Sequence, residues 1–257
     1  MPATDWGWLI TPDELASWIL RNDEDLLVLN KPPLVVCHPS KKGPWSSLIG
    51  ACREYLGLDV LHMPSRLDRE TSGVLIFAKN RELASRMQTA IAKRNVRKTY
   101  LAIVEGRFAE RIIVNQPIDR DGTSEVRLRQ WVRETGASAE TEFVPVSIAD
   151  NYTLVEVHPR TGRLHQIRVH AAWLGHPIVG DKLYGPDERL FLEFIEHGWT
   201  ASMGEQLELP RQALHASELE FDLGGGTVIK FEAPLTEDLR AFCATAGLSD
   251  PSLTYDA

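Results

Sequence analysis

The chain has no hydrophobic run long enough to cross a membrane, because none of its apolar stretches approaches the roughly 18 residues that a spanning helix needs. Its first residues, Met1 to Trp6, also lack the basic segment and apolar segment of a secretory signal. These two absences predict a cytoplasmic protein that does not bind membranes.

Cysteine is scarce and scattered. The chain has only three, which are Cys37, Cys52 and Cys243. They have neither the spacing of a metal site nor the even number of a disulfide framework, which fits a reducing compartment. The sequence also has no Walker loop, no dinucleotide fingerprint and no paired metal-ligand motif. His165 and His170 are five residues apart, on different faces of a helix, so no metal site is expected there.

The chain has fewer basic than acidic residues overall, but one segment of it is basic. The chain of 257 residues is 43% hydrophobic and 25% charged, with a net charge of −8, and it is long enough for one large domain or two closely associated subdomains. Residues 60–133 hold 15 Lys and Arg against 8 Asp and Glu, whereas residues 186–257 hold 4 against 14. This asymmetry predicts one surface that faces a polyanion. The alternative is that both signs mix in space.

One aspartate stands in an unusual setting. Asp68 lies between Arg66 and Arg69, shortly before Gly73 and the apolar residues 74–78. Cations on both sides favour the ionised carboxylate, and a buried strand gives it a rigid support. The pattern therefore indicates a nucleophile or general base. The alternative is an ordinary turn aspartate with two solvated arginines.

Three further segments accompany this one. The four pieces, in chain order, are Asn30-Lys31-Pro32 in residues 27–33 with His38-Pro39, Arg66-Leu67-Asp68, Lys98-Thr99-Tyr100 in residues 98–106, and residues 160–170 followed by Gly180-Asp181 and Leu183-Tyr184-Gly185. Together they resemble the RluA-type family of RNA pseudouridine synthases, over roughly residues 25–235. The chain departs from the family pattern at Ser65, where the family has His, and at Leu164, where it has Thr or Ser.

The periodicity of the sequence predicts an α+β protein. Helices are expected at about residues 12–21, 45–56, 81–93, 163–174 and 235–244, and strands at 26–30, 74–79, 99–104, 141–148, 152–157, 213–221 and 228–231. In the helix at 163–174, the expected buried stripe is Leu164, Ile167, Ala171 and Leu174. The resemblance implies the pseudouridine synthase fold, a long bent mixed, mainly antiparallel sheet flanked by helices with a central cleft. We expect an N-terminal extension (1–24), a catalytic domain (25–235) and a C-terminal helix and tail (236–257).

The activity that the resemblance implies is isomerisation of a uridine in structured RNA, either ribosomal or transfer RNA. The bond from ribose to the uracil nitrogen breaks, the base turns, and a carbon–carbon bond forms at carbon 5. Neither redox change nor loss of phosphate occurs, so no cofactor or metal is expected. The partner is RNA, and the chain is expected to be a monomer.

The resemblance also implies three catalytic residues. Asp68 would attack the anomeric carbon or remove a sugar proton, and either role needs an ionised carboxylate. Arg168 would pair with Asp68, and Thr71 or main-chain amides would add the hydrogen bonds that a buried pair requires. Tyr100 would lie against the uracil and help to deprotonate carbon 5, and its stacking on the base contributes ~1–3 kcal/mol. The alternative for Tyr100 is a packing residue of the strand.

A second set of residues is predicted to bind the RNA. It comprises Arg66, Thr71, Lys93, Arg94, Lys98, Arg163 and His165. Arg66 would fill the gap that the displaced base leaves in the stack. Arg163 and His165 would orient their loop or contact phosphate.

Two rival functions are open at this point. The chain could be a non-catalytic RNA-binding protein that keeps the fold, although Asp68, Tyr100 and Arg168 are all present. It could also be a glycosidase that uses Asp68 and Glu70 as paired carboxylates. An assay with RNA and with a polysaccharide separates these functions.

Overall fold

The computed structural model describes residues 8–38 and 43–249, and it divides into two compact units. Of the described residues, the first unit contains those up to Lys98 and 216–234, and the second contains 99–215 and 235–249. Strands β4 (Val96–Glu105) and β10 (Leu214–Asp222) each have residues in both units. Pro39 of the opening motif and the segment from Met1 to Trp6 lie outside the described residues.

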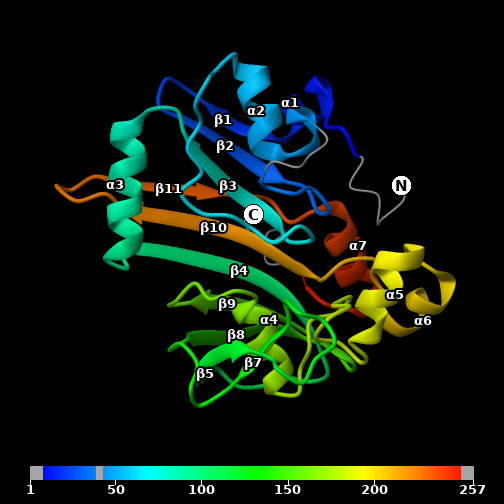
Figure 1. Cartoon of the computed structure of the whole chain (residues 1–257). Helices are drawn as coiled ribbons and strands as arrows, with labels where there is room; N and C mark the ends of the chain where they lie inside the picture. Colours follow the sequence, from blue (N-terminus) through cyan, green and yellow to red (C-terminus); the bar gives the residue numbers. More distant parts are fainter. Residues whose placement is uncertain (1–7, 39–42, 250–257) are drawn as a thin grey trace. The chain divides into compact units, whose positions relative to one another are not determined.

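The first unit contains a sheet with the strand order β1 (Ile19–Asn22), β2 (Leu26–Lys31), β3 (Ser72–Ala78), β10 and β11 (Val228–Glu232). The pairs β1–β2, β2–β3 and β10–β11 are antiparallel. The helices of this unit are α1 (Pro12–Trp18), the short 3₁₀ helix η1 (Pro44–Ser46), α2 (Leu48–Leu56) and α3 (Arg81–Ala92) (Figure 1). A core that includes Leu15, Leu29, Leu48 and Phe77 joins α1 and α2 to strands β2 and β3.

The second unit contains the strand order β4, β9 (Tyr152–Pro159), β8 (Glu140–Ile148) and β5 (Ile112–Asn115), in which every pair is antiparallel. A separate antiparallel hairpin joins β6 (Ile118–Arg120) to β7 (Gln130–Val132). The helices are α4 (Gln166–Trp173), α5 (Arg189–His197), α6 (Ala201–Leu207) and α7 (Glu237–Ala246). The predicted α+β class with a large, mainly antiparallel sheet is confirmed, whereas the central cleft stays a prediction.

Several predicted elements have the expected local causes. Helix α1 begins with a capping box between Thr11 and Glu14 and has Pro12 in its first turn. Helix α2 ends at Gly57, which adopts the left-handed conformation of a helix C-cap. Helix α3 begins at the N-cap Asn80 and buries Met87, as its apolar stripe predicts.

Among the helix boundaries that were predicted wrongly, two have a clear structural cause. Helix α1 ends at Trp18 rather than near Arg21, because Ile19–Asn22 pairs with β2 as strand β1. Helix α4 begins at Gln166 rather than at Arg163, because His165 has the left-handed conformation (φ 55°). Leu164 is 42% exposed and is therefore not part of the buried stripe, whereas Ile167 and Ala171 are buried. The sequence did not predict β1, β5, the β6–β7 hairpin, α5 or α6.

Candidate active site

Asp68 lies in the loop that leads into β3. The amide of Thr71 donates to the Asp68 carbonyl at 3.2 Å, which closes a turn, and Thr71 itself is buried. The Asp68 residue is half-buried, while Arg66 is exposed. The turn thus places a carboxylate at the end of a strand whose residues are all buried, so its support is rigid.

The main chain around Asp68 is anchored from the segment that follows β2. The ammonium of Lys31, fully buried, donates to the carbonyls of Pro32 (2.8 Å) and Arg69 (3.0 Å). The thiol of Cys37 donates to the carbonyl of Leu67 at 3.4 Å. Both residues that flank Asp68 in the chain are therefore held through their carbonyls. Burial lowers the pKa of the Arg69 guanidinium, which donates through Nε to a carbonyl of the same segment at 3.3 Å.

Gly73 is required where this loop enters β3. Its φ is +113°, and a Cβ at this position would lie 2.2 Å from the carbonyl oxygen of Ala216 in β10. Any side chain would therefore both strain the backbone and force β10 away. The Gly that the sequence marked as a turn residue is thus needed for the close approach of two strands.

Tyr100 lies on β4 and pairs with Val157 of β9. It is half-buried and packs against the hydrophobic core of the second unit. The strand therefore fixes the position of the phenol ring. A packing role and a catalytic role for Tyr100 both stay predictions.

Arg168, on helix α4, forms a buried two-point ion pair with Asp181. Its Nε and Nη2 donate to the two carboxylate oxygens at 2.6 Å and 2.8 Å. Asp181 also accepts from the amides of Leu183 (3.0 Å) and Tyr184 (3.1 Å). Burial alone would raise the pKa of Asp181, but Arg168 and these amides outweigh burial, so its pKa is lowered. The guanidinium is thus held in one plane by a charged partner.

Tyr184 lies against the same guanidinium. The centre of its ring is 4.9 Å from the Arg168 Cζ, and its hydroxyl is 2.9 Å from Nδ1 of His165. The main-chain amide of Gln130, in β7, donates to the hydroxyl at 2.9 Å. Burial raises the pKa of the Tyr184 phenol well above its usual range, so it stays protonated. Arg168 and His165, both predicted site residues, are therefore brought together by a residue that sequence reasoning did not assign to the site.

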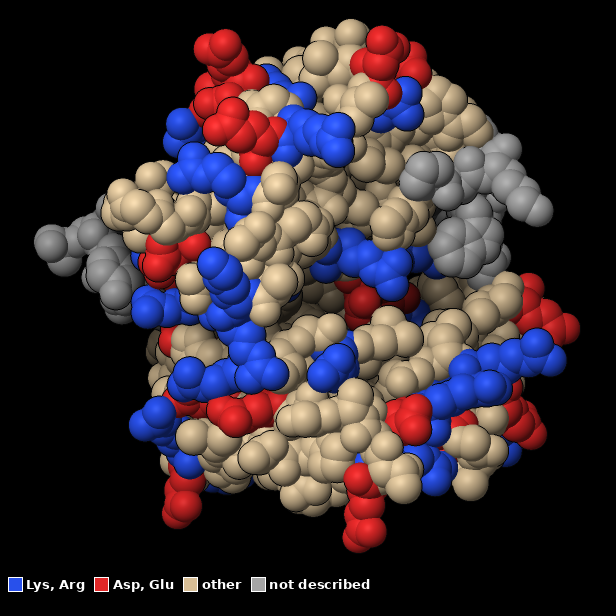
Figure 2. Space-filling model, turned by 60° about the vertical axis from the view of Figure 1, so that its left-hand side comes forward, with Lys and Arg blue, Asp and Glu red and all other residues tan. Residues whose placement is uncertain are grey.

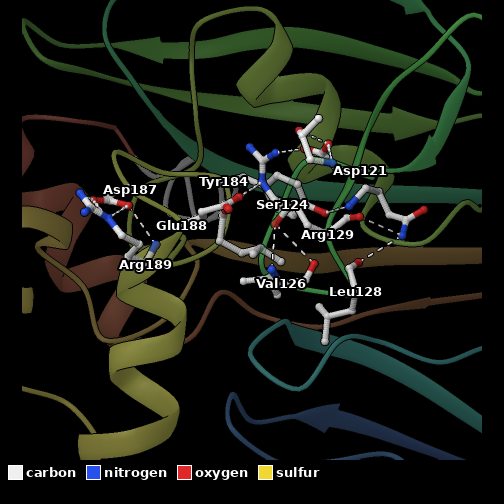
Figure 3. Close-up of polar contacts among 12 residues, drawn as sticks. Asp121, Ser124, Val126, Leu128, Arg129, Tyr184, Asp187, Glu188 and Arg189 are labelled. Atoms are coloured by element: carbon white, nitrogen blue, oxygen red, sulfur yellow. Dashed lines mark hydrogen bonds and ion pairs between the residues drawn. The ribbon is translucent and has the colours of Figure 1, made fainter.

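The β6–β7 hairpin adds a second cation beside Tyr184. Arg129 lies 5.5 Å from the centre of the Tyr184 ring and 4.8 Å from that of Trp131. It forms ion pairs with Asp121, which is 5% exposed, and with Glu188 at 3.0 Å; Figure 3 shows these residues. Asp121 and Arg129 were not found from the sequence, because no motif marks them. Tyr184 could have been found, since it belongs to the quoted Leu183-Tyr184-Gly185 motif.

The predicted basic surface centres on α3 and the residues that follow it. Lys93, Arg94 and Arg97 are exposed, with Arg81 and Arg86 on the same helix. Arg97 lies 3.9 Å from Glu220, and burial lowers the pKa of Lys98. Figure 2 turns the side of Figure 1 where α3 lies toward the viewer, and it shows Lys and Arg side chains gathered there with some Asp and Glu between them.

Within residues 8–38 and 43–249, no group of three or more His, Cys, Asp and Glu side chains could hold a metal ion. His170 is buried and bonded to Thr141 and to the carbonyl of Gln116, whereas His165 is bonded to Tyr184. The two histidines therefore have different partners. No helix in the described part of the chain is long and apolar enough to span a bilayer.

Comparison with known families decides the identity. The family model described as RNA pseudouridylate synthase matches residues 25–173, which contain Asp68, Tyr100 and Arg168. The chain belongs to the RNA pseudouridylate synthase family. The members of this family are RNA pseudouridine synthases, and the enzyme class predicted from the sequence is confirmed.

Curated relatives and solved structures agree with the family. The enzyme is 34% identical to the uncharacterized RNA pseudouridine synthase YhcT of Bacillus subtilis (strain 168), over 88% of this chain and 71% of that protein. It is also 34% identical to the ribosomal large subunit pseudouridine synthase D of Vibrio vulnificus (strain CMCP6), over 90% and 73%. The solved structure of human RNA pseudouridylate synthase domain containing 4 has a TM-score of 0.73 and 26% identity, over 93% of this chain and 97% of that one.

The predicted site residues of the synthase fall into two groups. Those in the first unit are Arg66, Asp68, Thr71, Lys93, Arg94 and Lys98, and those in the second are Tyr100, Arg163, His165 and Arg168. Arg163 is exposed and donates through Nε to the carbonyl of Ser138 at 3.0 Å, so it holds its own loop. The predicted pairing of Asp68 with Arg168 joins the two groups and stays a prediction, as do the domain boundaries at residues 24 and 235.

Proposed function

We propose that this enzyme isomerises a uridine of structured ribosomal RNA to pseudouridine, with Asp68 as its essential group. Relatives that are 33–34% identical are named as synthases of the ribosomal large subunit, which favours ribosomal over transfer RNA. The observation that carries the assignment of Asp68 is its loop, which Lys31 and Cys37 tie down through carbonyls on either side. Such preorganisation is what a catalytic carboxylate needs.

The reaction needs no atom from outside the substrate except a proton exchanged with water. Asp68 attacks the anomeric carbon and displaces uracil, or it removes a sugar proton and leaves a glycal. The uracil then turns and bonds to the sugar through carbon 5. The proton on carbon 5 is lost, the ring nitrogen gains one, and Asp68 is regenerated. Both routes begin from an ionised carboxylate.

Three arginines, a histidine and an aromatic ring would assist these steps. Arg168 would keep Asp68 ionised, and Tyr100 would stack on the uracil. Displacing the base from a helical stack costs a few kcal/mol, and the exposed Arg66 would fill the gap. Arg163 and His165 would contact phosphate.

The exposed basic side chains on and after α3 would bind the RNA backbone. Lys93 and Arg94 follow the last turn of the helix and are both exposed. Phosphate contacts of this kind supply affinity and position without reading sequence. Target choice would therefore rest on the residues around Asp68 and His165 rather than on α3.

A direct assay tests the proposal. Ribosomal RNA and transfer RNA from a strain that lacks the gene are incubated with the purified enzyme, and pseudouridines are mapped by carbodiimide modification and primer extension. A stop that appears in ribosomal RNA with the wild type and is absent with Asp68→Asn supports the proposal. A stop in transfer RNA alone overturns the choice of RNA. Binding without any new stop, in either RNA, would identify a non-catalytic RNA-binding protein.

A further inference from the structure

Tyr184 is the point where four groups of the second unit meet. Its ring lies over the guanidinium of Arg168 (4.9 Å), and Arg129 also lies over the ring (5.5 Å). Its hydroxyl contacts Nδ1 of His165 and the amide of Gln130, each at 2.9 Å. Tyr184 is only 3% exposed, so bulk water does not compete for these contacts.

The two contacts of the Tyr184 hydroxyl bear on the tautomer of His165. The amide of Gln130 can only donate, so the oxygen of Tyr184 accepts there. The hydroxyl proton is then available for Nδ1 of a neutral imidazole, and when Nδ1 accepts it the ring proton lies on Nε2. In that arrangement Nε2 is the donor edge of the imidazole.

His165 also has a costly backbone conformation. Its φ of 55° lies in the left-handed region, and it is the N-cap of α4 without any side-chain capping bond. Such a conformation in a residue other than glycine persists where the surroundings hold it, and it is frequent at functional sites. The contact with the Tyr184 hydroxyl restrains the imidazole ring of this residue.

Asp181 binds the edge of the Arg168 guanidinium, and it also binds the main chain of Tyr184, whose ring lies over the face of the same guanidinium. Asp181 accepts from the amide of Tyr184 at 3.1 Å while both of its oxygens hold Arg168. A guanidinium that is bound at its edge by a carboxylate and at its face by an aromatic ring has little freedom to rotate.

We propose that Tyr184 is a positioning residue for the isomerisation: its ring sets the plane of Arg168, its hydroxyl sets the tautomer and direction of His165, and the β6–β7 hairpin holds Tyr184 through Gln130 and Arg129. The inference rests on the proposed function, since Arg168 and His165 matter only if this site handles a uridine. It adds to that function a role for Tyr184, which the sequence marked only as part of a motif, and for the β6–β7 hairpin, which no motif marked. The hairpin is itself braced by the buried carboxylate of Asp121, which pairs with Arg129 and with Arg133 at 2.9 Å.

The first test removes one oxygen atom. Tyr184→Phe keeps the ring over Arg168 and loses both bonds of the hydroxyl. We expect the single-turnover rate on the mapped RNA to fall about tenfold to a hundredfold, as small losses of alignment do. The dissociation constant for the RNA should stay within about twofold, because Tyr184 is buried and no phosphate reaches it.

Tyr152→Phe is the matched control. It removes a phenol hydroxyl in the same unit, one that bonds Glu208 at 2.5 Å and contacts none of Arg168, His165 or Gln130 in the described bonds. Its rate should equal that of the wild type. If both variants lose the same fraction of activity, the loss reflects a general effect on the unit and the proposal is wrong.

The second test does not depend on turnover. Nitrogen-15 NMR of histidine-labelled protein reports which ring nitrogen carries the proton, and His165→Gln identifies the signal. We expect the Nε2–H form in the wild type and a mixture of tautomers in Tyr184→Phe. An unchanged tautomer in the variant, or an Nδ1–H form in the wild type, overturns the proposal.

The two proposals fail in different ways. If the wild type forms no pseudouridine in any RNA, the proposed function fails, whatever the tautomer of His165. If the wild type is active and Tyr184→Phe is as fast, the positioning role fails and the function stands. A slow Tyr184→Phe that has the wild-type unfolding midpoint supports the positioning role.

Discussion

Asp181 holds Arg168 with both carboxylate oxygens, at 2.6 Å and 2.8 Å, and the exposure of the two side chains is 0% and 9%. Breaking a buried pair by removing one charge leaves the other unpaired. Asp181→Asn should therefore lower the free energy of unfolding by about 3–5 kcal/mol, measured in urea. Asp187→Asn, which removes the partner of the exposed Arg189, should cost much less, because water screens that pair. Equal losses for the two variants would show that the buried Asp181 pair contributes no more to the free energy of unfolding than an exposed pair does.

The same carboxylate predicts a pH dependence. The pKa of Asp181 is lowered in the folded state, so the pair adds stability above the unfolded pKa of roughly 3.9 and loses it as pH falls toward the folded pKa. The stability difference between the wild type and Asp181→Asn should thus be largest near neutral pH and shrink below about pH 4. Urea titrations at several pH values measure it. A difference that stays constant down to about pH 2 would contradict the lowered pKa.

Asp68→Asn should abolish turnover while leaving RNA affinity nearly unchanged. The amide has the same shape as the carboxylate, but it can serve neither as nucleophile nor as base. Tritium release from carbon 5 of labelled uridine measures the reaction, and filter binding measures affinity. Glu70→Gln removes the other carboxylate of this loop and serves as the control that should stay active. Activity of Asp68→Asn within about tenfold of the wild type would refute the assignment.

Tyr100→Phe should keep the stacking surface and lose most of the product, because the hydroxyl that would help to deprotonate carbon 5 is gone. The ring packs against the core in either variant, so the unfolding midpoint should change little. Tritium release and thermal unfolding, measured together, separate a role of the hydroxyl from a role in packing. Normal turnover in Tyr100→Phe would mean that Tyr100 is only a packing residue of β4.

RNA affinity should fall steeply with salt in spite of the net charge of −8. Each neutralised phosphate adds about −0.7 to −0.9 to the slope of log affinity against log salt. Replacing Lys93 and Arg94 with Ala should flatten that slope by about one to two units without changing which uridine is modified. Replacing Arg107 and Arg240, both exposed and both in the second unit, removes the same charge away from α3. An equal change in that control would mean that net charge, not the α3 surface, governs binding.

The sequence predicted the elements whose causes are local. The capping box at Thr11 and Glu14, the left-handed Gly57 and the buried strand after Gly73 each follow from residues within a few positions of one another. The four motifs gave the family and the positions of Asp68, Tyr100 and Arg168. These predictions needed no knowledge of which distant segments meet.

The remaining features depend on distant contacts. The start of α4 was placed three residues early because His165 has the left-handed conformation, and the imidazole of this residue contacts Tyr184, which lies 19 residues away. Gln130 contributes only a main-chain amide to Tyr184, so its side chain carries no signal at all. Asp121 resembles any turn aspartate until Arg129 and Arg133 are known to meet it.

Lys31 binds the loop of Asp68 through the carbonyl of Arg69, and this atom is the same whatever side chains the loop carries. The bond from Lys31 therefore does not constrain the identity of Glu70. Replacements of Glu70 can alter the shape presented to RNA while Lys31 still holds the backbone beside the carboxylate. A scaffold with this property can change its RNA target through single substitutions while the catalytic carboxylate keeps its position.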